Sequence, residues 1–227
     1  MDIFSTPFHI FNMGNQAKEF NDALVRDIEI ERADNDGDQR SNVGCWMSFL
    51  GLEKKHESFA QMQSVAQVHV FQAMQEAKFT NIQEEFVVKD LWAIAMDKPG
   101  DYISPHIHGS GNMVYTGVYY PSTGHANGKR IKEDEDLDKD HHFQASTTPA
   151  SGGNLVLVDP ARSIKSQVIN DCSIEKYPYY GIPYVIAPRE SILCTFPNWV
   201  EHYVTPLTND EVVRYSISFC VYKRKKM

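Results

Sequence analysis

A change in the spacing of hydrophobic residues near residue 84 is the feature that most constrains the fold of this chain. Before that point, apolar residues recur every three to four positions, which is the period of an amphipathic helix. After it, they occur in short runs bounded by glycine and proline, which is typical of β-strands. No helical pattern separates these runs, so they indicate an antiparallel sandwich or barrel.

Two helices are expected in the first part of the chain. Asn15 can cap the first helix, in which Phe20, Leu24 and Ile28 follow at intervals of four. We expect both helices to cover one outer face of the β-structure. The second helix spans about residues 57–77, and its apolar stripe contains Phe59, Met62, Ala66, Val70, Ala73 and Ala77.

The strands are expected from residue 84 onward. The first run places Phe86, Val88, Trp92, Ile94 and Met96 on one parity, and Asp90 breaks its pattern. The other strand-like runs are residues 113–120, 154–158, 164–169, 184–187, 191–196 and 212–222. With no internal repeat and no linker, we expect one domain over residues 1–227, in which 1–83 give helical support and 84–227 form the β-structure.

The last predicted strand has two chemically different faces. The polar face either meets solvent or lines a polar cavity, and on this strand alone solvent is favoured. The preceding segment, Phe-Pro-Asn-Trp-Val-Glu-His, ends in His202. Such a segment just before Arg-x-Ser is unusual for a plain edge strand, so it favours a cavity. We expect the apolar face to pack against the helices. That face carries Val213, Tyr215, Ile217, Phe219 and Val221, and the polar face carries Arg214, Ser216 and Ser218.

Three histidines are candidate metal ligands. His106 and His108 have the spacing that puts two imidazoles on one side of an extended chain. His202 lies about a hundred residues downstream, and Arg214 follows it at a distance of twelve residues. A non-haem iron centre needs a facial ligand set with open positions, and a keto-acid carboxylate needs a bidentate cation such as arginine.

The composition excludes several other classes of protein. A net charge of −8 argues against a non-specific nucleic-acid binder, which needs a basic face. The four cysteines form no CxxC pair, so neither a disulfide framework nor a zinc site is expected. The chain shows no apolar run of membrane-spanning length and no signal-peptide pattern, so we expect a cytoplasmic protein without a membrane partner.

The order of these motifs resembles a known superfamily. His-x-His, Gly-Val-Tyr-Tyr, Asp159-Pro160, Phe-Pro-x-Trp-x-x-His and Arg-x-Ser are together similar to the 2-oxoglutarate and Fe(II)-dependent oxygenases, especially their prolyl-hydroxylase-like side. The resemblance implies a double-stranded β-helix, a cupin-like jelly roll, with Fe(II) at its open end and 2-oxoglutarate as cosubstrate. It also implies a dioxygenase that uses O2 to hydroxylate a peptidyl or small-molecule substrate and releases succinate and CO2.

The resemblance also implies roles for individual residues. His106 and His202 match two metal ligands of the superfamily. Arg214 matches the residue that binds the far carboxylate of 2-oxoglutarate, with Ser216 beside it. Tyr120 stands where related enzymes often place a tyrosine on the same carboxylate, and the alternative is a partly buried strand tyrosine, which is common.

The chain departs from the superfamily at position 108, where an acidic ligand is expected and His108 stands instead. Either His108 binds the metal, or Asp159 reaches it from another strand, or water takes the position. We favour His108, because imidazole is a normal Fe(II) ligand. Imidazole must be unprotonated to bind, so metal affinity is expected to fall below about pH 6.5. The alternative function is that of a jelly-roll metal- or ligand-binding protein without catalysis. For the oligomeric state, a homodimer is one possibility.

Overall fold

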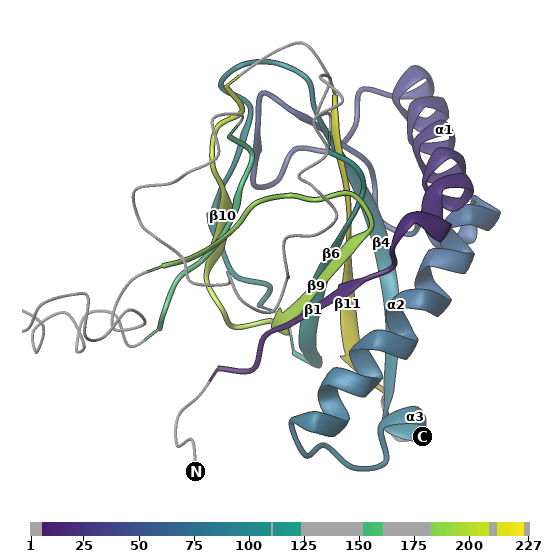
Figure 1. The fold of residues 1–227 in the computed structure, drawn as a ribbon, viewed down its shortest axis with the longest axis vertical. Helices are drawn as coiled ribbons and strands as arrows, with labels where there is room; N and C mark the ends of the chain where they lie inside the picture. The colour runs from purple at the N-terminus through teal and green to yellow at the C-terminus, as the bar shows by residue number, and fades with distance from the viewer. Residues whose placement is uncertain (1–5, 110, 124–151, 161–182, 209–212, 225–227) are drawn as a thin grey trace, which may run out of the picture.

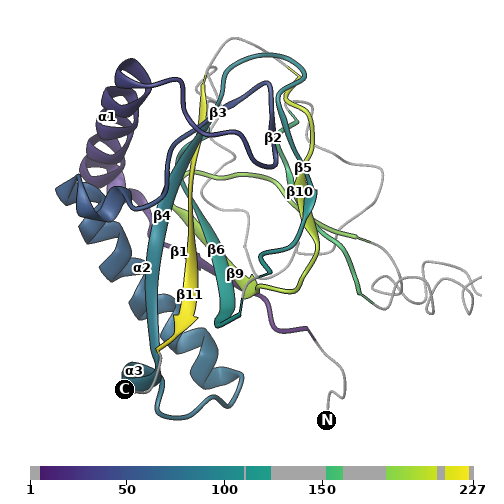
Figure 2. The same ribbon diagram turned by 180° about the vertical axis from the view of Figure 1, so that it is seen from behind.

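The computed structural model describes residues 6–109, 111–123, 152–160, 183–208 and 213–224. Within them, two antiparallel β-sheets face each other, and two long helices cover the outer face of the larger sheet (Figure 1). Figure 2 shows the same three layers from behind. A mainly β architecture with N-terminal helices is therefore confirmed.

The larger sheet has the strand order β1-β9-β6-β11-β4-β3. Its strands are β1 (His9–Asn12), β3 (Trp46–Met47), β4 (Phe86–Met96), β6 (Met113–Ser122), β9 (Ile192–Pro197) and β11 (Arg214–Lys223). The smaller sheet has the order β2-β5-β10-β7-β8. Its strands are β2 (Asn42–Val43), β5 (Tyr102–His106), β7 (Leu155–Leu157), β8 (Tyr184–Ile186) and β10 (His202–Val204).

The helices agree with the expected positions. The first, α1 (Lys18–Asp34), follows a 3₁₀ turn, η1 (Asn15–Ala17), and no side chain caps it at Ala17. The side chain of Asn15, the expected cap, lies outside the described residues. The second is α2 (Glu57–Glu76), which is preceded by the 3₁₀ turn η2 (Leu52–Lys54) and followed by the short helix α3 (Ile82–Glu85).

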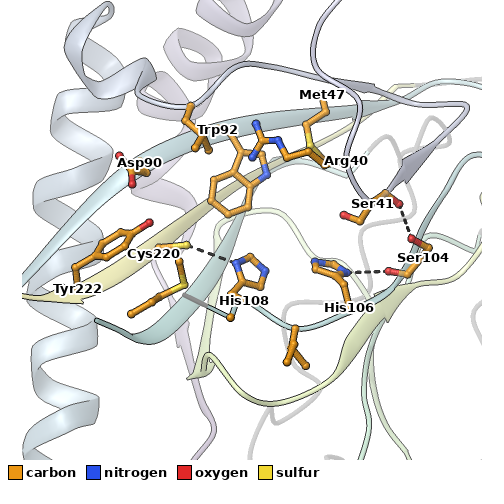
Figure 3. A pocket seen from close by; sticks show the side chains of 14 residues that line it. Arg40, Ser41, Met47, Asp90, Trp92, Ser104, His106, His108, Cys220 and Tyr222 are labelled. Carbon is orange, nitrogen blue, oxygen red and sulfur yellow. Dashed lines mark hydrogen bonds between the residues drawn. The ribbon is translucent and has the colours of Figure 1, made fainter. Parts of the chain in front are cut away.

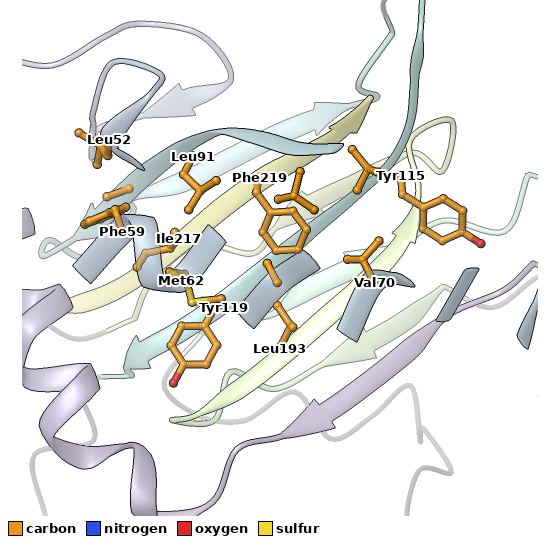
Figure 4. Packing of buried hydrophobic residues seen from close by; sticks show 14 of the residues in the cluster. Leu52, Phe59, Met62, Val70, Leu91, Tyr115, Tyr119, Leu193, Ile217 and Phe219 are labelled. Carbon is orange, nitrogen blue, oxygen red and sulfur yellow. The ribbon is translucent and has the colours of Figure 1, made fainter. Parts of the chain in front are cut away.

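The core between the helices and the larger sheet confirms the prediction for the last strand. Tyr215, Ile217, Phe219 and Val221 of β11 lie in one buried cluster with residues of both helices (Figure 4). Val213, just before the strand, packs against the same cluster. The helices contribute residues at the predicted spacing, namely Leu24, Ile28, Phe59, Met62, Ala66 and Val70. The opposite face of β11 is therefore directed between the two sheets.

A β-bulge in β4 corrects the predicted parity of that strand. The pairing with β11 shifts between Ser218 and Cys220, where β4 carries one extra residue. Asp90 adopts a positive φ of 57° at this point. The bulge reverses the alternation of side chains between the two faces of β4. The prediction that the apolar residues of this strand share one face was therefore wrong. Phe86 and Val88 face the helices, whereas Trp92, Ile94 and Met96 face the inside of the jelly roll.

A carboxylate from the helical layer holds this bulge. The backbone N–H groups of Asp90 and Leu91 donate to the two carboxylate oxygens of Glu53, at 3.2 and 3.0 Å. These donors are displaced from the strand ladder by the bulge, and Glu53 satisfies them. The turn η2 therefore decides which side chains of β4 enter the interior.

Glu53→Ala is expected to lower the free energy of unfolding by about 2–4 kcal/mol, because two hydrogen bonds to a charged acceptor are lost. Urea unfolding followed by circular dichroism measures the change. Glu19→Ala, an exposed acidic residue in the first turn of α1, is the control and should cost less than about 1 kcal/mol. A similar small loss for Glu53→Ala would mean that the bulge is stable without its carboxylate.

The strand predictions were correct in type and incomplete in number. The expected runs at 113–120, 154–158, 184–187, 191–196 and 212–222 correspond to β6, β7, β8, β9 and β11, and the run at 164–169 lies outside the described residues. The strands β1, β2 and β3, which come from the first 83 residues and join the sheets, were not predicted from the sequence. Nor were β5 and β10, which have three to five residues each and carry histidines.

Candidate metal centre

Three histidines converge between the two sheets, as the sequence analysis expected. His106 ends β5, His202 begins β10, and these two residues are direct partners in the antiparallel pairing. His108 follows β5 by two residues. One ring nitrogen from each of the three lies within 4.8 Å of the other two. The structure thus brings together side chains that are about a hundred residues apart in sequence.

Hydrogen bonds orient two of the rings. Nδ1 of His106 lies 2.8 Å from the carbonyl oxygen of Ser104, and Nδ1 of His202 lies 2.9 Å from that of Val200. A carbonyl can only accept, so each Nδ1 carries the proton and donates it. Each Nε2 therefore keeps a free lone pair, and this arrangement is common in histidines that bind metals.

The third ring approaches one of these lone pairs. His108 Nε2 lies 3.2 Å from His202 Nε2, and the two rings are nearly parallel, at 17°. Two nitrogens at about 2.1 Å from one metal ion, with an angle near 90–100° between them, are about 3.0–3.2 Å apart. The observed separation therefore fits two ligands of one ion, and the donor set fits a divalent metal such as Fe(II).

Burial keeps the three rings neutral. It lowers the pKa of His108 to about 4, with smaller contributions from the charges of His106 and Arg40. It lowers the pKa of His202 to about 3, again with the neighbouring histidines contributing. The pKa of His106 is lowered by the same cause. Neutral imidazole is the form that binds metal. Protons should therefore compete with the metal only at a pH below the ordinary histidine pKa.

The metal-free protein is expected to lose stability as the pH falls from 7 to 5. Between the ordinary pKa of 6.5 and the lowered folded-state values, the unfolded chain binds protons that the folded chain does not, so unfolding becomes more favourable. The loss should be about 2 kcal/mol for each of His108 and His202. Urea unfolding at both pH values measures it. His202→Gln, which cannot titrate, should show a loss smaller by that amount, and an equal loss would contradict the prediction.

No acidic residue joins this histidine cluster within the described part of the chain. Asp159, one of the alternatives for the third ligand, lies in the loop after β7 and is not a member of the cluster. The geometry thus favours His108 over Asp159 as the third ligand, and that assignment remains a prediction.

Arg214 is a buried cation without an anionic partner among the described residues. It is 2% exposed on the inner face of β11. Its Nη1 lies 3.2 Å from the sulfur of Met96 and 3.4 Å from the hydroxyl of Ser216, and its Nε has no hydrogen-bond partner in the ranges that the structure describes. Burial lowers the pKa of Arg214, but a guanidinium stays protonated. Buried charges are normally paired, so this position fits an anionic ligand.

The surroundings of Arg214 provide a further donor and room for the arginine side chain itself. The guanidinium lies over the ring of Tyr120, 5.0 Å from its centroid. The Tyr120 hydroxyl is buried and has no hydrogen-bond partner within the described part of the chain, and burial raises its pKa, so it keeps a proton to donate. At Gly153, a Cβ would lie 2.9 Å from Arg214 Cδ. Gly153 also has a φ of +67°, which suits glycine. A buried guanidinium beside a hydroxyl donor fits a ligand that carries a carboxylate.

A cleft of about 510 Å³ opens onto His106 and His108 (Figure 3). Trp92 stacks against the His108 ring, with centroids 5.6 Å apart, and the Arg40 guanidinium lies 5.7 Å from the Trp92 centroid. Two apolar residues of the cleft, Leu50 and Ile107, are 48% and 55% exposed. Exposed apolar side chains beside a candidate reaction centre suit substrate binding.

Several of these residues were not foreseen from the sequence. Arg40 and Gly153 come from loops without a motif. For Trp92, the break at Asp90 was the available signal, since a bulge was needed to turn it inward. Cys220, which lies 3.5 Å from His108, gave no signal beyond its position in the last strand.

Comparison with known proteins identifies the family. The sequence pattern of the family described as "Putative 2OG-Fe(II) oxygenase" matches residues 90–220, which is more than half of the chain. The chain belongs to this family of 2-oxoglutarate- and Fe(II)-dependent oxygenases. The match includes His106, His108, His202 and Arg214. No curated protein matches the chain in sequence.

Solved structures with low sequence identity share the fold. A prolyl-4-hydroxylase from Pseudomonas putida is 15% identical, with a TM-score of 0.61, over 97% of this chain and 95% of that chain. A prolyl hydroxylase from Trichoplax adhaerens, in complex with a hypoxia inducible factor peptide fragment, is 14% identical, with a TM-score of 0.57, over 96% and 84%. HygX from Streptomyces hygroscopicus, with nickel and 2-oxoglutarate bound, is 9% identical, with a TM-score of 0.55, over 96% and 83%.

The predicted double-stranded β-helix is therefore confirmed, as are Fe(II) and 2-oxoglutarate as cofactor and cosubstrate of the family. In the part of the chain that the structure covers, none of the helices has both the length and the apolar character needed to cross a bilayer.

Proposed function

We propose that this oxygenase is a single-domain dioxygenase that hydroxylates a peptidyl or small-molecule substrate and releases succinate and CO2. The observation that carries the proposal is a pair of complementary sites on the inner side of the jelly roll. One is a set of three neutral imidazoles around one point, and the other is a buried arginine without an anionic partner among the described residues.

In this proposal, His106, His108 and His202 hold Fe(II) through their Nε2 atoms. Arg214 binds the far carboxylate of 2-oxoglutarate, and the ring of Tyr120 and the hydroxyl of Ser216 lie near its guanidinium. Fe(II) and 2-oxoglutarate supply the oxidising chemistry, in which O2 and 2-oxoglutarate yield a hydroxylated substrate, succinate and CO2.

The chain itself contributes orientation and exclusion of water. The carbonyl groups of Ser104 and Val200 keep two imidazole rings in the metal-binding tautomer. The buried guanidinium fixes one end of the cosubstrate, so that its keto-acid end has a defined direction. The cleft beside Trp92 receives the substrate on the side of His106 and His108. The peptide bound by the Trichoplax adhaerens neighbour supports a peptidyl substrate, and the HygX neighbour leaves a small molecule open.

An anaerobic titration with Fe(II) and 2-oxoglutarate, followed by exposure to O2 and measurement of succinate, tests the proposal. We expect the protein to bind one equivalent of each and to form succinate only when both are present. Binding of both without succinate, even with candidate substrates added, would favour the alternative of a non-catalytic ligand-binding protein. Failure to bind Fe(II) or failure to bind 2-oxoglutarate would contradict the proposed dioxygenase.

A further inference from the structure

Cys220 is the neighbour of His108 on the side of the ring that faces away from His202. Its sulfur lies 3.5 Å from Nδ1 of His108, and the side chain is buried, with 3% exposed (Figure 3). Burial raises the pKa of this thiol to about 12, so the sulfur keeps its proton. The contact joins β11 of the larger sheet to the loop that follows β5.

The partner of His108 differs in kind from those of the other two rings. His106 and His202 each donate Nδ1–H to a carbonyl oxygen, which can only accept and therefore allows one tautomer. A thiol is a weak donor and a weak acceptor, so it can bond to Nδ1 with or without a proton. The position of Cys220 is thus compatible with both neutral tautomers of His108.

If no metal ion lies between the two rings, the short contact to His202 requires one of these tautomers. His202 carries its proton on Nδ1, so its Nε2 can only accept. The 3.2 Å contact is then a hydrogen bond only if His108 carries its proton on Nε2. Nδ1 of His108 is left as an acceptor, and the thiol of Cys220 is the donor that faces it.

Metal binding requires the other tautomer. If Nε2 of His108 binds a metal ion, its proton must move to Nδ1. This exchange leaves the net charge of the ring and the thiol unchanged. The thiol turns from donor to acceptor, and Nδ1–H stays bonded within a buried environment.

We propose that Cys220 is a positioning residue for His108, donating to Nδ1 in the metal-free protein and accepting from Nδ1–H when Nε2 binds metal. The inference rests on the proposed three-histidine centre. Partners of this kind hold the ring orientation of a metal ligand, and their loss typically weakens metal binding 10–100-fold.

Zn(II) is a suitable probe, because it is diamagnetic and binds to the protein without O2 chemistry. Ring ¹⁵N chemical shifts of metal-free and Zn(II)-loaded protein report the tautomer of each histidine. We expect His108 to change from the Nε2–H to the Nδ1–H form on loading, whereas His106 and His202 keep Nδ1–H in both states. In Cys220→Ala, the dissociation constant for Zn(II) should rise about tenfold or more. Of the three histidines, only His108 should show ring ¹⁵N chemical shifts that differ from those of wild type.

Matched variants separate this role from packing. Cys220→Val preserves an apolar side chain suited to a strand but has no donor or acceptor, so it should weaken Zn(II) binding as Cys220→Ala does. Cys220→Ser has a hydroxyl with both capacities and should recover most of the loss. Cys194→Ala removes another buried thiol and should leave Zn(II) binding within twofold of wild type.

Two results would overturn the inference. One is a His108 tautomer that is the same with and without Zn(II), and the other is unchanged Zn(II) affinity in Cys220→Ala or Cys220→Val. Failure of the underlying metal centre would look different, because His108→Ala would then bind Zn(II) as tightly as wild type. Loss of affinity in His108→Ala together with wild-type behaviour of the Cys220 variants would retain the centre and reject only the role of Cys220.

Discussion

Arg214→Ala is expected to abolish measurable binding of 2-oxoglutarate while leaving the fold intact. In this variant the far carboxylate of the cosubstrate would be buried without a cation. Breaking a desolvated ion pair from one side costs about 3–5 kcal/mol, which is a factor of roughly 10² to 10³ or more in the dissociation constant. Because Arg214 has no carboxylate partner among the described residues, its removal leaves no buried anion behind in the ligand-free protein.

Anaerobic calorimetry of the metal-loaded protein with 2-oxoglutarate measures this effect. Arg214→Lys keeps the charge but loses the bidentate geometry, so its affinity should lie between those of wild type and Arg214→Ala. Arg26→Ala, which removes an exposed arginine of α1, is the control and should bind as wild type does. Undiminished affinity in Arg214→Ala, with an unchanged circular dichroism spectrum, would show that the cosubstrate binds elsewhere.

His106→Ala and His202→Ala are expected to lose most of their Fe(II) affinity. Each removes one of three neutral nitrogen donors that lie within 4.8 Å of one another. Loss of a residue that only orients a ligand costs 10–100-fold, so loss of a ligand itself should cost more than about 100-fold. Anaerobic equilibrium dialysis against Fe(II) measures the affinity. His69→Ala, which removes a histidine of α2 outside the cluster, should keep it.

Substitutions at His108 test the departure from the superfamily. His108→Asp supplies the acidic ligand of the family pattern and should retain iron, because a carboxylate is also a normal Fe(II) ligand. His108→Ala should lose most of the affinity. If His108→Ala binds Fe(II) as tightly as wild type, the three-histidine centre is wrong, and Asp159 or water becomes the better candidate.

The helices and the last strand show why part of the fold was predictable. The apolar stripe of α2 and the alternation in β11 follow from local periodicity, which is 3.6 residues in a helix and 2 residues in a strand. Both patterns met in one core because each leaves a single apolar face to bury. Short strands such as β5 and β10 carry too few residues for a periodic signal, so they were missed although they hold His106 and His202.

The sequence alone determined the residue types that the chemistry needs and their order along the chain. His106, His108, His202 and Arg214 were identified in this way, since H-x-H spacing and an Arg-x-Ser strand are local patterns. Tertiary structure alone decided which nitrogens point at one another, and which group each ring meets on its other side. The bulge held by Glu53 and the thiol of Cys220 beside His108 both depend on residues brought together from distant segments. Such contacts arise from sheet register and packing, which no local pattern encodes.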